Sequence, residues 1–289
     1  MPKKRELMTA ADVNGAWVIL PSSAKDGAED WRMEDTLDLD ETSRVVEALI
    51  RAGVDGILSM GTFGECATMT WEEKKRFMAT IVESARGRVP VFVGTTTLNT
   101  RDTIAHTRYA ADLGADGTML GVPMWCAPSV ATAARFYKDV GEACPDMAIC
   151  VYANPEAFKF DFPPPFWSQV AEVRQVITCK YIGIVNLLQN IERTSSKIRF
   201  LPIEFDYYAA ARLDPEFCTA FWTSGVLCGP KPTIALRDEV QKAKSSGDWS
   251  RAKRLSQEMG KTTETLFPHG SFKEFSMYNI GIEKERMNA

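Results

Sequence analysis

The sequence predicts an α/β protein, and within that class a (β/α)8 TIM barrel with an appended C-terminal helical segment. Short apolar runs alternate with longer amphipathic stretches along the chain, and eight such runs are present. Strands that alternate with crossover helices form a parallel sheet, and eight such units fit a closed barrel. An open doubly wound sheet is the alternative, but the glycine-rich first turn that such sheets usually have is absent.

The apolar runs have the length and composition of buried strands. They are Gly15–Leu20, Gly56–Ser59, Val89–Val93, Gly117–Leu120, Ala148–Tyr152, Val176–Lys180, Phe200–Ile203 and Thr219–Trp222. The stretches between them have helical periodicity. The expected helices include Asp40–Ala52, Thr70–Arg86, Thr100–Leu113, Ser129–Ala143 and Pro164–Val173.

We expect two regions, a barrel over residues 1–230 and a helical extension packed on it over residues 231–289. The second region contains no strand-like run, and its expected helices are Ile234–Lys244, Asp248–Thr265 and Phe272–Ala289. No linker rich in glycine or serine separates the two regions.

The composition excludes several classes of partner. A formal net charge of −4 argues against nucleic acids and anionic membranes. No stretch approaches the roughly 20 apolar residues that cross a bilayer. The basic start Lys3–Arg5 is followed by Glu6 and not by the apolar region of a secretory signal. The 7 cysteines are scattered without a Cys-x-x-Cys pair, which predicts reduced thiols and a cytoplasmic location.

The sequence also lacks the motifs of metal and nucleotide sites. The two histidines, His106 and His269, are too few and too far apart for zinc chemistry, and a Ser-His-Asp hydrolase is poorly supported. No Walker loop or dinucleotide-binding glycine motif occurs. We therefore expect no metal site and no cofactor.

Lys180 is the residue that points to chemistry, because it closes an apolar run that otherwise predicts a buried strand. Desolvation of a buried lysine favours its neutral amine, which can attack a ketone and form a Schiff base. The alternatives are a lysine whose head reaches water and a lysine paired with Glu172. Taken alone, Lys180 favours these structural alternatives, and only its neighbours along the chain reverse that preference.

Those neighbours lie at the carboxyl ends of other strands, where (β/α)8 barrels carry their active sites. Thr62 and Phe63 lie between two glycines, Gly61 and Gly64, so that their backbone can approach a small carboxylate closely; a plain turn is the equal alternative. Tyr152 precedes Lys180 by one β/α unit, which places the two residues on adjacent strands. A tyrosine there is more often a packing residue, but a neighbouring cation would favour tyrosinate and proton transfer.

The combination of Gly61–Glu65, Tyr152–Pro155 and Lys180 resembles the dihydrodipicolinate synthase and N-acetylneuraminate lyase superfamily. Its members are pyruvate-handling class I aldolases on a (β/α)8 barrel. Residues 57–68, 118–125 and 152–162 further resemble the hydratase-aldolases of polycyclic aromatic hydrocarbon catabolism, on naphthalene and phenanthrene pathways. That resemblance covers nearly the whole chain.

The resemblance implies a role for each matching residue. Lys180 would be the Schiff-base lysine and Tyr152 the proton shuttle. Thr62 and Phe63, with Gly61, would bind the pyruvate carboxylate. The residues implied for the aromatic and C4 side of the pocket, or for its C-terminal border, are Trp125, Asn154, Ile203 and Asn279.

The implied activity is hydration and retro-aldol cleavage of an ortho-substituted benzylidenepyruvate, without metal or cofactor. The resemblance also implies a homo-oligomer, and specifically a tetramer. Because Ile203 replaces a polar partner suited to a phenolic hydroxyl, we favour the 2-carboxybenzalpyruvate type of substrate, with the ortho-hydroxy compound next. The alternatives are a dihydrodipicolinate synthase-like condensation, a sugar-acid lyase, and a non-catalytic barrel that senses a keto acid.

Overall fold

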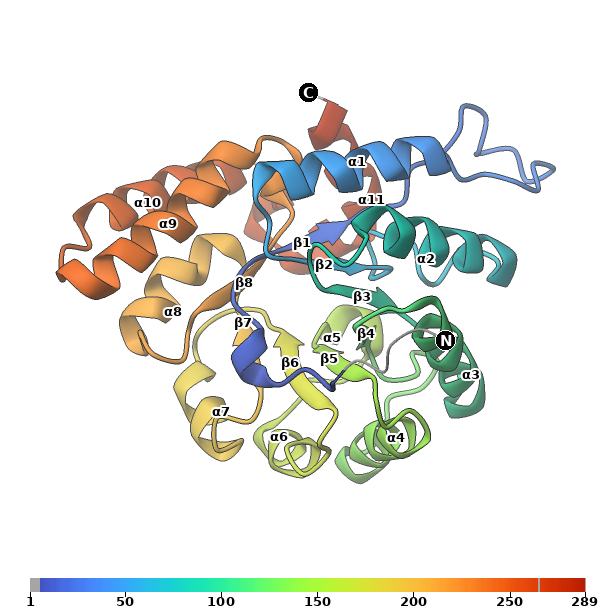
Figure 1. Cartoon of the computed structure of the whole chain (residues 1–289), viewed down its shortest axis with the longest axis horizontal. Helices are drawn as coiled ribbons and strands as arrows, with labels where there is room; N and C mark the ends of the chain where they lie inside the picture. The colour runs from blue at the N-terminus through green and yellow to red at the C-terminus, as the bar shows by residue number, and fades with distance from the viewer. Residues whose placement is uncertain (1–5, 265, 289) are drawn as a thin grey trace.

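The computed structural model describes residues 6–264 and 266–288. The basic segment Lys3–Arg5 and the predicted helix ends at Thr265 and Ala289 lie outside the described residues. In Figure 1 the strands form a ring that is surrounded by helices, as expected for a (β/α)8 barrel. Within the described residues, no helix is both long and apolar enough to cross a membrane.

Eight parallel strands follow the order β7-β6-β5-β4-β3-β2-β1-β8 around the ring. Their bounds are β1 (Gly15–Leu20), β2 (Gly56–Ser59), β3 (Val91–Gly94), β4 (Gly117–Leu120), β5 (Ala148–Tyr152), β6 (Val176–Lys180), β7 (Arg199–Leu201) and β8 (Ala220–Thr223). The predicted third strand began at Val89, but Pro90 has no N–H group for a strand ladder, and the observed strand starts after it.

Helices surround the barrel and form the C-terminal region. They are α1 (Leu39–Ala52), α2 (Trp71–Ala85), α3 (Thr100–Leu113), α4 (Val130–Ala143), α5 (Pro155–Phe158), α6 (Pro164–Val170), α7 (Leu187–Arg193), α8 (Tyr207–Leu213), α9 (Pro230–Ser246), α10 (Ser250–Thr263) and α11 (Phe272–Asn288). Asp38, Thr70, Asn99 and Ser129 accept a backbone N–H bond at four helix starts. The short helices α5, α7 and α8 were not among the predicted ones.

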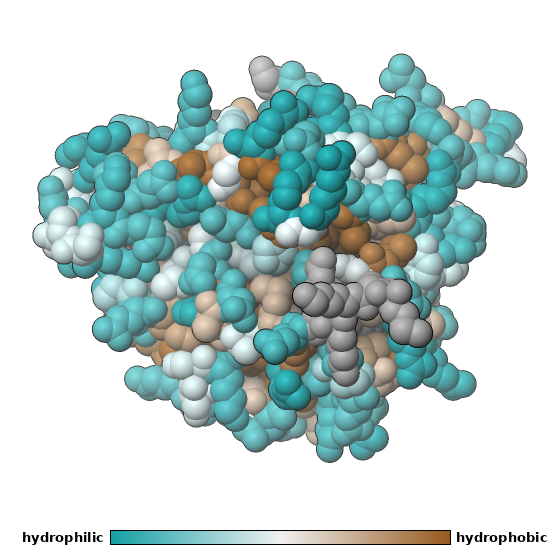
Figure 2. Space-filling view, in the orientation of Figure 1, coloured by the Kyte–Doolittle hydropathy of each residue, from teal (hydrophilic) through white to brown (hydrophobic). Residues whose placement is uncertain are grey.

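The C-terminal helices pack against different parts of the barrel. Helix α9 packs against α1, α8 and β1, where it covers the barrel wall, and α10 packs on α9. Helix α11 instead lies behind β1 and β2 in Figure 1 and contributes Phe275 and Glu283 to the buried residues. The division of the chain at residue 230 stays a prediction. The opposite outer face, shown in Figure 2, is predominantly hydrophilic.

Side chains rather than a strand ladder close the barrel between β7 and β8. Among the described residues, an isolated backbone bridge there joins Ile203 to Trp222. Next to it, the carboxylate of Glu204 accepts hydrogen bonds from the Thr223 hydroxyl, from the Gly225 amide at 3.0 Å and from the Thr233 hydroxyl at 3.2 Å. Glu204 is 3% exposed, and burial raises its pKa although these donors oppose the effect.

This arrangement predicts a pH-dependent contribution of Glu204 to stability. A raised folded-state pKa gives stability that is present below the unfolded-state pKa and is lost as the pH rises through the folded-state pKa. The free energy of unfolding of the wild type, minus that of Glu204→Gln, should therefore fall as the pH rises above the ordinary glutamate value. Urea unfolding at a series of pH values measures it. The exposed Glu216→Gln is the matched control, and a difference independent of pH would contradict the prediction.

Candidate active site

The pairing of β5 with β6 places Tyr152 directly beside Lys180. Ile149 pairs with Val176, but the register then shifts at a bulge, so that Cys150 pairs with Thr178 and Tyr152 with Lys180. Without the shift, Tyr152 would pair with Cys179. Because side chains alternate between the faces of a sheet, a slip of one residue would send Tyr152 and Lys180 to opposite faces. The bulge therefore places Tyr152 and Lys180 side by side on the same face of the sheet.

Lys180 is buried, with 6% of its surface exposed. Its Nζ atom lies 4.5 Å from the centroid of the Tyr152 ring and 3.7 Å from that of the Trp222 ring. The sequence left open a pairing with Glu172, but Glu172 instead forms an ion pair with Lys197 at 3.0 Å. The surroundings of the amine are thus aromatic faces, which tolerate a cation and do not block attack on a carbonyl.

The hydroxyl group of Tyr152 has two polar partners. It lies 2.9 Å from the Thr62 hydroxyl and accepts a hydrogen bond from the Asn154 amide at 3.1 Å. Burial alone would raise the pKa of the phenol, but the charge of Lys180 and the hydrogen bonds of Thr62 and Asn154 outweigh it and lower that pKa. A phenol with a lowered pKa, next to an amine, suits proton transfer.

Asn154 is held in place by the start of α5. Its side-chain oxygen accepts the Ala157 amide at 3.2 Å as the helix cap, so its side-chain nitrogen must face Tyr152. Pro155 at the first helical position has the dihedral angle that this start requires. The Tyr152–Pro155 segment therefore orients both polar groups.

The loop after β2 brings Thr62 to the same place because its glycines permit close packing. A Cβ atom at Gly61 would approach Met119 to 3.0 Å and the Tyr152 ring to 3.2 Å, and one at Gly64 would meet the Met60 backbone at 2.6 Å. The loop also buries Phe63, which is 5% exposed. Thr62 thus reaches the Tyr152 hydroxyl from the side of β2.

A cavity of about 50 Å³ lies at the centre of these groups. Six residues predicted from the sequence line it, namely Gly61, Phe63, Tyr152, Asn154, Lys180 and Asn279. Thr62 borders a second, more open pocket of about 530 Å³ formed with residues 276–282 of α11. The loop after β2, the ends of β5 and β6, and α11 therefore meet at one site.

Other residues lining the cavity were not predicted. They are Ile19, Ile182, Trp222, Ser224, Phe272, Phe275 and Glu283. Trp222 closes the last predicted strand, so the rule that barrel sites lie at strand ends could have found it. Phe272, Phe275 and Glu283 come from α11, and no local pattern in the sequence indicates which face of that helix covers the barrel.

Besides Thr62, two predicted residues are not among those lining the cavity. Trp125 lies in the loop after β4, where it is 77% exposed and its carbonyl accepts a hydrogen bond from Lys159 at 3.4 Å. Ile203 packs against the barrel core beside its bridge to Trp222. Neither residue lines the cavity of Lys180, and their contact with a substrate stays a prediction.

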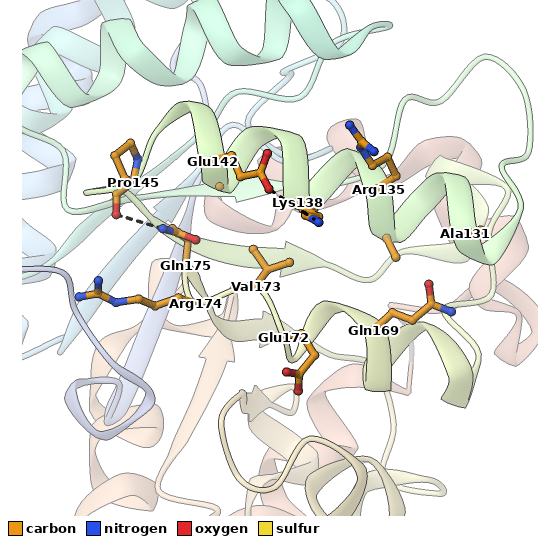
Figure 3. A pocket seen from close by; sticks show the side chains of 12 residues that line it. Ala131, Arg135, Lys138, Glu142, Pro145, Gln169, Glu172, Val173, Arg174 and Gln175 are labelled. Atoms are coloured by element: carbon orange, nitrogen blue, oxygen red, sulfur yellow. Dashed lines mark hydrogen bonds and ion pairs between the residues drawn. The ribbon is translucent and has the colours of Figure 1, made fainter.

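A roomier groove of about 540 Å³ runs between α4 and α6 on the outer surface (Figure 3). Among its polar side chains, Lys138 pairs with Glu142 at 3.8 Å, and Gln175 donates to the Pro145 carbonyl at 3.1 Å. Arg135 and Glu172 pair with Asp139 and Lys197, which lie outside the groove. None of its lining residues belongs to the Lys180 cavity. The chemistry of the molecule therefore lies at the strand ends and not in this groove.

The fold and the site together define a class: a (β/α)8 barrel with a buried lysine at the end of β6 and a tyrosine beside it on β5. The model of the dihydrodipicolinate synthetase family matches residues 30–202. The chain belongs to this family.

Similar proteins include hydratase-aldolases. The chain is 61% identical over 285 residues to trans-O-hydroxybenzylidenepyruvate hydratase-aldolase of Sphingobium xenophagum, covering 99% of this chain and 87% of the relative. It is 59% identical to the enzyme of that name from Pseudomonas putida, over 99% and 86%. It is 35% identical to trans-2'-carboxybenzalpyruvate hydratase-aldolase of Nocardioides sp. strain KP7, over 98% and 85%.

One solved structure, "PhdJ bound to substrate intermediate", superposes with a TM-score of 0.91 at 41% identity, covering 96% of this chain and 85% of that one. The predicted barrel with C-terminal helices is therefore confirmed.

The lowered pKa of Tyr152 depends on the charge of Lys180, and this predicts the effect of Lys180→Met. Burial of the phenol would remain while the attraction of the ammonium for the phenolate would disappear, so the pKa of Tyr152 should rise. Ultraviolet titration of phenolate absorbance, with Tyr152→Phe as the variant that lacks this transition, measures the change. An unchanged titration would show that Lys180 does not act on the phenol.

Proposed function

We propose that this protein is a Schiff-base hydratase-aldolase that converts an ortho-substituted benzylidenepyruvate and water to pyruvate and an aromatic aldehyde. The observation that carries the proposal is the buried Lys180 amine beside the Tyr152 phenol. The identity to hydratase-aldolases over nearly the full chain supports it.

In the first step, the Lys180 amine attacks the C2 carbonyl, whose oxygen leaves as water. The resulting iminium is conjugated with the C3=C4 double bond, so C4 becomes electrophilic toward water. The faces of the Tyr152 and Trp222 rings, next to Nζ, would stabilise the positive charge on this nitrogen.

After hydration, Tyr152 removes the proton of the C4 hydroxyl while the C3–C4 bond breaks. The bonding electrons move into the iminium and form an enamine, and the aldehyde leaves. Protonation at C3 and hydrolysis of the imine release pyruvate and the free lysine. Thr62 and Asn154 hold the phenol in place for this transfer. The lysine imine is the electron sink of this sequence.

The substrate carboxylate would lie against the loop of Gly61, Thr62 and Phe63. A second hydroxyl side chain is absent there because Phe63 is apolar, so backbone N–H groups must supply more of the binding. Phe63 lines the cavity and is buried.

For the substituent on the aromatic ring of the substrate, we favour the ortho-hydroxy group. The preference for an ortho-carboxylate depended on Ile203, which does not line the cavity. The relatives named for the ortho-hydroxy compound are 59–61% identical, against 35% for the relative named for the carboxylated one. Burial of a neutral phenol also costs less than burial of a second carboxylate without a cationic partner.

The other candidate functions fit the cavity less well. Phe63, Trp222 and Phe275 line it, which disfavours the polyhydroxylated chain of a sugar-acid substrate. A non-catalytic keto-acid sensor would have no use for the Tyr152 contact with Lys180. Three further expectations stay predictions: the tetrameric state, the cytoplasmic location and a place in naphthalene or phenanthrene catabolism. Light scattering tests the tetrameric state.

The proposed imine predicts covalent trapping. Borohydride in the presence of pyruvate should add one reduced pyruvate to the peptide that contains Lys180, as read by mass spectrometry. Lys180→Arg should lose both adduct and turnover, because a guanidinium stays protonated in proteins. The matched control is Lys159→Arg, which should keep both. An adduct on another lysine would overturn the assignment.

The choice of substrate predicts an order of specificity. Among the ortho-hydroxy, ortho-carboxy and naphthyl arylidenepyruvates, the ortho-hydroxy compound should have the highest kcat/KM, because its substituent is neutral when buried. Loss of the alkene absorbance measures each rate. If the carboxylated compound is best, the ring assignment is wrong while the hydratase-aldolase assignment stands.

A further inference from the structure

Helix α11 brings a carboxylate into the cavity of Lys180. Glu283 is 6% exposed and lines the same cavity as Lys180 and Tyr152. Phe275, Asn279 and Glu283 follow one another at four-residue intervals, so they lie on one face of α11, and this face covers the strand ends. A buried glutamate is uncommon in a cavity without a purpose.

Two hydrogen bonds hold this carboxylate and leave acceptor capacity on both of its oxygens. The Ser224 hydroxyl donates to Oε1 at 3.0 Å, and Arg286 donates to Oε2 at 3.2 Å. A carboxylate has about four acceptor positions, so each oxygen can accept one more donor. Ser224 lies two residues after Trp222, whose ring is 3.7 Å from the Lys180 amine. Glu283 is thus anchored beside the lysine by the end of β8.

A second polar group on the same face of α11 lacks a partner. The Oδ1 atom of Asn279, one turn before Glu283, is buried and has no hydrogen-bond donor among the described residues. Buried polar groups are normally satisfied by protein, water or ligand. Water or a substrate hydroxyl bound between these two side chains would satisfy Asn279 and use the free acceptor positions of Glu283.

The proposed reaction needs a second proton-transfer group. Tyr152 serves the C4 hydroxyl during cleavage, while hydration needs a base for the attacking water and an acid for C3. We infer that Glu283 is the group that adds water across the double bond, an inference that rests on the proposed function.

Glu283 takes a proton as the water oxygen bonds to C4, and the electrons of C3=C4 move to the iminium to form an enamine. Glu283 then returns the proton to C3, which restores the iminium of the hydrated substrate. The net change is addition of one water, and the carboxylate is regenerated for the next turnover.

The test separates the two halves of the reaction with Glu283→Gln. One assay follows the loss of the arylidenepyruvate alkene, and the other follows pyruvate release from the synthetic hydrated aldol. Hydration should fall by about 10²–10⁴-fold, the usual cost of losing a general acid–base group, whereas cleavage of the hydrated aldol should stay close to the wild-type rate. Pyruvate trapping by borohydride should persist, which confirms that the variant folds and forms the imine.

Three further variants serve as controls. Glu285→Gln changes an exposed carboxylate on the same helix and should leave both assays unchanged. Lys284→Met removes the 2.8 Å ion pair that ties α11 to Glu65, so it should raise KM in both assays alike. Glu283→Asp keeps the carboxylate and should recover part of the hydration rate.

The outcomes are distinct. Equal slowing of both assays by Glu283→Gln would mean that the residue only docks α11, and this would overturn the inference, as would hydration at the wild-type rate. A wild type inactive on both compounds would instead overturn the proposed function, and the inference with it.

Discussion

The contact between Tyr152 and Lys180 is the interaction on which the rest of the site depends, and a bulge between β5 and β6 creates it. The shift in register advances β6 by one residue and puts the two side chains on one face of the sheet. The phenol then lies next to the amine, and the charge of Lys180 can lower the pKa of Tyr152 against the opposing effect of burial. Thr62 and Asn154 have their positions because they bond to that phenol.

Two buried carboxylates, Glu204 and Glu283, organise the side of the barrel where the strand ladder is incomplete. Glu204 links the end of β7 to the residues after β8, and Glu283 links the same residues to α11. Glu65 accepts hydrogen bonds from Ser22 and Lys284, which ties the loop after β2 to α11. Because Ser224 and Glu283 line the cavity, the contact that holds α11 on the barrel also shapes the space available to a substrate.

The cavity combines aromatic walls with a few polar groups that have definite directions. Phe63, Trp222 and Phe275 provide apolar surface, while Lys180 and Glu283 lie on strand and helix elements that restrict their movement. Its volume of about 50 Å³ is small for an arylidenepyruvate, so a bound substrate requires side chains or α11 to move. Helix α11 is therefore a wall of the site.

The sequence by itself determined the barrel, because eight apolar runs recur along the chain with amphipathic stretches between most of them. It also determined the places of Lys180, Tyr152, Asn154 and the loop after β2, since strand ends of a parallel barrel meet at one rim. Only the tertiary structure decided which residues face Lys180. The bulge in β6, the ring of Trp222 and the face of α11 that carries Glu283 depend on packing between segments far apart in the chain. Local patterns carry no information about such contacts, and the contact of Trp125 and Ile203 with a substrate, which the family resemblance implies, stays a prediction.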